Sequence, residues 1–167
     1  MIGNFSGFYR GKVLASDVNE SLHAGRIKVE VYPMLVGIET ARVLKSSDSS
    51  IEIDGITTDQ LPWAYPATPL FAGAGTGSGT FCVPDIGSTV WIFFENGVIY
   101  QPVYFAEAPD AVHGLPSSRE TNYPQRRVIR MSSGAEIIFD DSTGDILITG
   151  ANDVIIQGDT AVRINPL

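Results

Sequence analysis

Few side chains in this sequence have the types and spacing that catalysis needs. The adjacent carboxylates Asp140 and Asp141 could be imagined as a glycosidase pair, but neighbours on a strand point to opposite faces and would not converge on one substrate. The glycine-rich segment 73–79 lacks the Gly-Lys-Ser/Thr of a phosphate loop, and a strand pattern follows it where a nucleotide-binding turn would need a helix. No Gly-x-Ser-x-Gly nucleophile elbow occurs. We therefore predict no catalytic residues.

Metal and thiol chemistry are equally poorly supported by the sequence. The two histidines, His23 and His113, are far apart in the chain, and the acidic residues near the C-terminus lack the ligand spacing of calcium loops. The single cysteine, Cys82, excludes an intrachain disulfide and lies in an apolar stretch, which predicts a buried, unreactive thiol. We predict no metal site and no cofactor.

The charge balance narrows the range of partners. The 167 residues include 11 basic and 19 acidic side chains, a net charge of −8, which disfavours nucleic acid and anionic membrane surfaces. The one basic cluster, Arg126 and Arg127 with Arg130 nearby, is predicted to be solvated or ion-paired. The N-terminus lacks an apolar signal region and no apolar run reaches about 18 residues, so we expect synthesis in the host cytoplasm without a signal peptide or membrane span.

Hydrophobic periodicity indicates an all-β chain. Helical spacing is almost absent, and turn pairs separate short runs rich in Val, Ile, Phe and Tyr. Within 25–32 the apolar Ile27, Val29 and Val31 alternate with charged residues, as in a half-buried strand. Trp63 and Trp91 are assigned to the core. The predicted barrel strands cover 7–16, 25–32, 63–67, 88–94 and 98–105, and a further short strand is predicted at 80–83.

These strands predict a five-stranded OB-type Greek-key barrel over residues 1–108. A polar tract within 34–58 suggests an insertion, with a hairpin turning at Asp54-Gly55, and Asn96-Gly97 predicts the turn of a second hairpin. Residues 109–130 are rich in proline and predict an extended linker.

After residue 130 the chain has an eight-residue rhythm. Ile138, Ile146, Val154 and Val162 are spaced by eight, and a second series runs two residues behind through Asp140, Ile148, Ile156 and Ile164. Turn residues recur at the same interval, at Gly134, Ser142, Gly150, Gly158 and Pro166. A lone strip of this kind leaves Ile and Val exposed, because each strand carries only two or three apolar residues.

Three copies wound about one axis would bury these side chains, at roughly 1.5–3 kcal/mol for each one fully buried. The pattern thus predicts a trimeric β-helix over residues 131–167, with acidic residues on its outer surface. The predicted trimer core is Ile138, Ile146, Ile148, Val154, Ile156, Val162 and Ile164.

Three segments of the barrel, 11–33, 61–69 and 79–108, resemble the OB-fold domain of contractile-tail phage baseplate spikes and of the valine-glycine-repeat spikes of type VI secretion. The most specific part is a Val83-Pro84-x-x-Gly87 turn, an aromatic strand and then Asn96-Gly97. The repeat at 134–165 is similar to the β-helix that follows this domain in the family.

The resemblance implies a structural, non-enzymatic homotrimer located in a virion tail baseplate or an equivalent injection particle. Its barrel would contact the tail hub ring, and its β-helix would be pushed through the target cell envelope when the sheath contracts. The linker is too short for the lysozyme domain that some members carry, and no His-x-His motif is present for an iron-binding tip. The apex, Asn165, Pro166 and Leu167, would then be an apolar plug or would be capped by a separate tip protein.

Two other classes of function make different demands. An OB-fold module for single-stranded nucleic acid or oligosaccharide needs exposed aromatic residues interleaved with Lys and Arg on one barrel face. A glycan-cleaving tail enzyme needs a groove with converging carboxylates. The acidic composition and the C-terminal repeat disfavour the first, and no motif supports the second.

Overall fold

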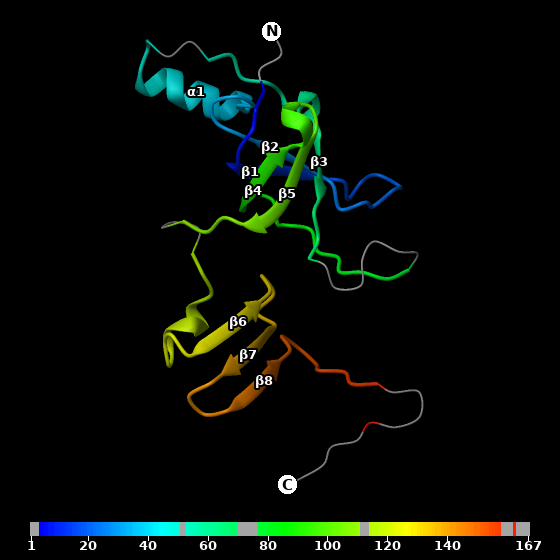
Figure 1. Cartoon of the computed structure of the whole chain (residues 1–167). Helices are drawn as coiled ribbons and strands as arrows, with labels where there is room; N and C mark the ends of the chain where they lie inside the picture. The colour runs from blue at the N-terminus through cyan, green and yellow to red at the C-terminus, as the bar shows by residue number, and fades with distance from the viewer. Residues whose placement is uncertain (1–3, 51–52, 70–76, 111–113, 158–161, 163–167) are drawn as a thin grey trace. The chain divides into compact units, whose positions relative to one another are not determined.

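The computed structural model describes residues 4–50, 53–69, 77–110, 114–157 and 162, and the chain divides into two compact units, residues 1–113 and 114–167 (Figure 1). The first unit contains β1 (Tyr9–Ser16), β2 (Ile27–Glu30), α1 (Ile38–Ser47), η1 (Thr58–Gln60), β3 (Trp63–Pro66), β4 (Thr89–Phe94), η2 (Glu95–Gly97) and β5 (Pro102–Glu107). The second contains η3 (Ser117–Glu120), β6 (Arg126–Arg130), β7 (Glu136–Asp140) and β8 (Asp145–Thr149). No helix in the described part of the chain has the length and apolarity needed to cross a membrane.

The five strands of the first unit form a closed barrel in the order β1-β2-β3-β5-β4, with β1 also paired to β4. All neighbouring pairs are antiparallel except β3 and β5, which run parallel. This arrangement confirms the all-β chain and the five-stranded OB-type barrel predicted from the sequence.

Alternating side chains fill the barrel. Val13, Ile27, Val31 and Ile92 are completely buried, so the alternation predicted for residues 25–32 is confirmed. On β1, Gly11 faces inward, and the space that a side chain would need there is taken by Val29. The barrel therefore closes tightly on β1 because this position has no side chain.

The insertion between β2 and β3 contains a helix, which corrects two predictions: α1 had no predicted counterpart, and residues 53–57 form no hairpin. Only Ala41 of α1 is buried, and the apolar residues at helical spacing, Ile38, Ala41 and Leu44, cover less than three turns. A parallel bridge between Gly37 and Ile56 joins the two ends of this insertion. The Glu30 carboxylate accepts hydrogen bonds from the Gly37 N–H at 3.1 Å and the Thr40 hydroxyl at 3.0 Å.

The segment before β4 also departs from the prediction. Residues 80–83 form no strand, and Cys82 is exposed rather than buried. Residues 80–83 are exposed, and the five strands β1 to β5 close the barrel without them. Asn96 and Gly97 adopt left-handed backbone angles, which confirms their turn, but β5 begins at Pro102 because the β4–β5 connection includes residues 95–101. Most of the predicted glycine loop, 70–76, lies outside the described residues.

The C-terminal unit is a three-stranded antiparallel sheet in the order β6-β7-β8. Its first strand, β6, begins inside the segment predicted as linker, because the arginines there pair with acidic residues of β7. Gly134 and Ser142 lie in the two turns, as their spacing predicted. After β8, residues 150–157 form neither helix nor strand.

Candidate assembly surfaces

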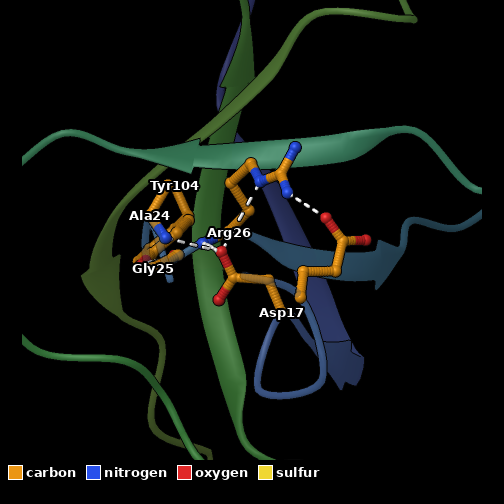
Figure 2. A network of polar contacts seen from close by, with 6 residues as sticks. Asp17, Ala24, Gly25, Arg26 and Tyr104 are labelled. Atoms are coloured by element: carbon orange, nitrogen blue, oxygen red, sulfur yellow. Dashed lines mark hydrogen bonds and ion pairs between the residues drawn. The ribbon is translucent and has the colours of Figure 1, made fainter. Parts of the chain in front are cut away.

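The loop between β1 and β2 is fixed by a polar network (Figure 2). Asp17 Oδ2 accepts hydrogen bonds from the backbone N–H of Ala24 at 2.8 Å and of Arg26 at 3.1 Å. The Arg26 guanidinium pairs with both Asp17 and Glu20. From β5, the Tyr104 hydroxyl donates to the Gly25 carbonyl oxygen at 2.6 Å. The loop thus returns to the barrel in one defined conformation.

Burial and hydrogen bonding set the protonation of this network. Burial raises the pKa of Asp17, but the hydrogen bonds from the backbone of Arg26 and Ala24 lower it by a larger amount. The resulting pKa of Asp17 is below the ordinary value. Burial raises the pKa of Tyr104 to about 12, with smaller contributions from Cys82 and Asp17. Asp17 is therefore ionised and Tyr104 protonated at neutral pH, which are the states that their hydrogen bonds require.

Both tryptophans lie on the outside of the barrel, which corrects their predicted place in the core. They are half-buried and stack against cations: the Arg26 guanidinium lies 4.9 Å from the Trp63 ring centre, and that of Arg10 lies 5.0 Å from Trp91. The Lys28 ammonium also lies 4.9 Å from Trp63 and donates to the Asp59 carbonyl at 2.7 Å. Arg26 and Lys28 are therefore already engaged within the chain.

Three phenylalanines form a second outer cluster, here called the aromatic patch: Phe8, Phe93 and Phe105. The ring centres of Phe8 and Phe105 are 5.2 Å apart, and Phe93 lies 6.1–6.4 Å from both. Phe8 is 69% exposed. Exposed aromatic clusters of this kind are typical of protein interfaces. The sequence analysis made no prediction for these three phenylalanines; the period-2 alternation along β4 could have shown that Phe93 faces outward.

The C-terminal sheet has two chemically different faces, because residues directly opposite one another on adjacent strands point to the same side. One, here called the polar face, carries Arg126, Val128, Arg130, Glu136, Ile138, Asp140, Asp145, Leu147 and Thr149. The other, here called the apolar face, carries Arg127, Ile129, Ile137, Phe139, Ile146 and Ile148.

The polar face is covered by the preceding segment of the same chain. The Ser118 hydroxyl donates to Glu136 at 2.8 Å, the Asn122 amide donates to Asp140 Oδ2 at 2.9 Å, and Arg126 donates to the Ser118 carbonyl at 3.3 Å. Arg126 also pairs with Asp140 at 2.8 Å, and Arg130 with Glu136. Glu136 and Asp140 are thus held against the preceding segment of the same chain. The prediction that the arginine cluster is ion-paired is confirmed.

Hydrogen bonds keep Glu136 and Asp140 ionised. Those from Ser142, Asn122 and Arg126 hold the pKa of Asp140 well below its usual range. The pKa of Glu136 is lowered chiefly by the Ser118 hydroxyl, against the opposing effect of burial, and further by Arg130. The ion pairs on this face therefore persist at mildly acidic pH.

The apolar face, unlike the polar face, has exposed side chains on all three strands. Ile146 is 65% exposed and Ile148 57% exposed, and Ile129 and Phe139 on the neighbouring strands are exposed as well. The only charged residue of this face on the three strands is Arg127, which is ion-paired with Asp141. The face is thus hydrophobic and locally neutral in a chain that is strongly acidic overall.

The residues predicted as a trimer core occupy different places. Ile138 is buried on the polar face, whereas Ile146 and Ile148 lie on the apolar face. Val154, Ile156 and Val162 are exposed, and Ile164 and the predicted apex at 165–167 lie outside the described residues. Counting by eight from Ile138 missed Ile129, Ile137 and Phe139, which two-residue alternation on β6 and β7 could have found.

The described residues contain no group of three or more His, Cys, Asp or Glu side chains placed to bind a metal ion. His23 lies in the β1–β2 loop with a left-handed backbone, and His113 lies outside the described residues.

The closed barrel in the order β1-β2-β3-β5-β4 defines an OB-type domain, here followed by a separate β-sheet unit. Residues 49–107 match the family model of the Type VI secretion system/phage-baseplate injector OB domain. The match confirms the predicted resemblance: the barrel is similar to the OB domain of phage-baseplate and type VI secretion injectors. No curated protein sequence matches the chain. The match supports a structural role in a tail baseplate or injection particle, assembled with other baseplate components, and the matched domain family is not known as enzymatic.

Proposed function

We propose that this protein is a structural central spike, a homotrimer that binds the tail hub ring through its barrel and helps to penetrate the target cell envelope. The observation that carries the proposal is the row of exposed Ile and Val side chains in the C-terminal unit, among them Ile146, Ile148 and Val154. One copy leaves these side chains in water, and association of copies would bury them. The trimeric β-helix predicted over residues 131–167 is the assembly that the eight-residue spacing favours.

The barrel supplies the surface proposed for the hub. In the aromatic patch, Phe8 and Phe105 are exposed and Phe93 is half-buried, and the patch lies on the outer side of a closed barrel. Large aromatic side chains at the centre of an interface contribute much of its binding free energy. A spike tip, either apolar or capped by a further protein, would complete the particle at the C-terminal end.

The alternative of an OB-fold module for oligosaccharide or single-stranded nucleic acid has less support. It needs cations that are free to meet a ligand, whereas the Arg26 guanidinium pairs with Asp17 and Glu20. Lys28 is buried and bonded to a backbone carbonyl. The net charge of −8 further disfavours a phosphate backbone.

Mass measurement by light scattering on the purified full chain tests the proposal. A homotrimer gives about three times the 18.0 kDa mass of one chain at micromolar concentration. A monodisperse species of one chain mass would overturn the proposed spike.

A further inference from the structure

We propose that the apolar face of the C-terminal sheet, and not its polar face, is the surface on which a second copy of this chain docks. This inference rests on the proposed function and adds the side of the sheet through which the copies meet. It assigns the contact to Ile129, Ile137, Phe139, Ile146 and Ile148.

The first argument is that the chain already occupies the polar face. Ser118 and Asn122, from the segment before β6, hydrogen-bond to Glu136 and Asp140 on that face. Asp140 is only 2% exposed and also accepts hydrogen bonds from Arg126 and from the backbone and hydroxyl of Ser142. A second copy docking there would have to displace these bonds and leave buried charges without partners, which is costly.

The second argument concerns charge. Two copies of a chain with a net charge of −8 repel one another unless they meet through a neutral surface. Arg127, the charged residue that the strands place on the apolar face, is neutralised by Asp141. On the polar face, by contrast, Asp145 lies directly opposite Asp140 in the β7–β8 pair. The apolar face is therefore the side on which identical acidic chains can approach closely.

The third argument is that the occupant must share the spacing of this surface. Ile146 and Ile148 stand two residues apart on β8, opposite Phe139 and Ile137 of β7, so the face is a regular array of branched and aromatic side chains. An identical copy carries the same array, so the side chains of two apolar faces can interdigitate and bury one another. This favours a second copy over an unrelated partner.

Two adjacent residues of β8 give a matched test. Ile148 lies on the apolar face and is 57% exposed, while Leu147 lies on the polar face and is 41% exposed. Light scattering is performed on the full-length wild type and on Ile148→Asp and Leu147→Asp variants. Ile148→Asp should lower the measured mass about threefold, to that of one chain, whereas Leu147→Asp should retain the assembled mass.

The milder pair Ile148→Thr and Leu147→Thr keeps β-branched or strand-compatible side chains, and circular dichroism checks that each variant remains folded. For this pair, only Ile148→Thr should shift dissociation to higher protein concentration. The assignment is overturned if the Leu147 variants dissociate while the Ile148 variants remain assembled, or if both residues behave alike. A wild-type chain that is itself monomeric would instead overturn the proposed function, so the two failures are distinguishable.

Discussion

Arg126 lies directly opposite Asp140 across the β6–β7 pair, and its guanidinium bonds to Asp140 Oδ2 through both Nε, at 3.0 Å, and a terminal nitrogen, at 2.8 Å. Two nitrogens on one oxygen, with Asn122 as a third donor, make Asp140 the acceptor that joins two strands and the segment covering them. Because a slip of one residue would exchange the two faces of the sheet, this pair also holds the register.

Replacing Asp140 by Asn should destabilise the C-terminal sheet at neutral pH and make its stability less dependent on acid. The folded-state pKa of Asp140 lies below the ordinary 3.8, so its ionised form stabilises the sheet fully above pH 3.8, and this contribution is lost as the pH falls from there toward the folded pKa. Hydrogen exchange of the β7 amides, followed from about pH 7 to about pH 3 with correction for intrinsic exchange, measures the effect.

The matched control for this prediction is Asp141→Asn. Asp141 also pairs with an arginine, Arg127, but both side chains are exposed, and such surface pairs contribute little. The control should therefore follow the wild type at every pH. If Asp140→Asn and the wild type showed the same protection across the range, the register role of Asp140 would be wrong.

Tyr104→Phe should lower the free energy of unfolding of the barrel by about 0.5–1.5 kcal/mol, the usual contribution of one hydrogen bond. The variant loses the bond to the Gly25 carbonyl and leaves that oxygen without its tyrosine partner. Urea unfolding followed by tryptophan fluorescence measures the difference, and Tyr100→Phe, at an exposed position, is the control.

Alkaline pH gives an independent check on Tyr104. Because its folded-state pKa is raised to about 12 from 10.0, the wild-type barrel should lose stability as the pH rises from 10 toward 12. The Tyr104→Phe variant has no hydroxyl to ionise at this position, so it should lose less stability over the same pH range. Equal alkaline sensitivity of the two proteins would contradict a buried, hydrogen-bonded tyrosine.

Gly11→Ala should destabilise the barrel by about 1–3 kcal/mol, because the added methyl group would overlap Val29 across the β1–β2 pair. Gly114→Ala is the control, since a methyl group there meets no atom within 4 Å. Thermal unfolding of both variants compares the two positions. A Gly11→Ala protein as stable as the control would show that β1 and β2 are less closely packed than described here.

Phe105→Ser should weaken binding of a hub-ring partner about tenfold or more while leaving barrel stability nearly unchanged, because its ring belongs to the exposed aromatic patch rather than to the core. Surface plasmon resonance with the hub protein of the same particle measures binding. Tyr100→Ser, which removes an exposed aromatic ring outside the patch, should bind normally. Equal losses for both variants would argue against a specific role for the patch.

The barrel could be predicted from the sequence because each strand buries one side, so apolar and polar residues alternate along it. The strand at 25–32 was recognised in this way from Ile27, Val29 and Val31, which are buried. The helix α1 was not recognised from periodicity, since Ala41 is its only buried residue and its other side chains reach solvent to varying extents. Cys82 was misplaced for a related reason: apolar neighbours suggest burial, but Phe81 is itself exposed.

The assembly surfaces were predicted only in part. The repeat included Ile146 and Ile148, which lie on the apolar face, yet spacing by eight cannot tell which side of a sheet a residue faces. Ile138 shares the spacing but faces the other way, toward Val128 and Leu147. That distinction depends on hydrogen-bond register, which is set by pairings such as Arg126 with Asp140 between strands that are separated by a turn.

Closure of the barrel has a consequence for where a further chain can add a strand. Each of its five strands has a partner on both sides, so the first unit offers no strand on which an uncontrolled fibre could grow. In the second unit β6 and β8 each pair with β7 alone among the described strands. Among the described strands, addition of a strand from a further chain is thereby confined to the C-terminal unit.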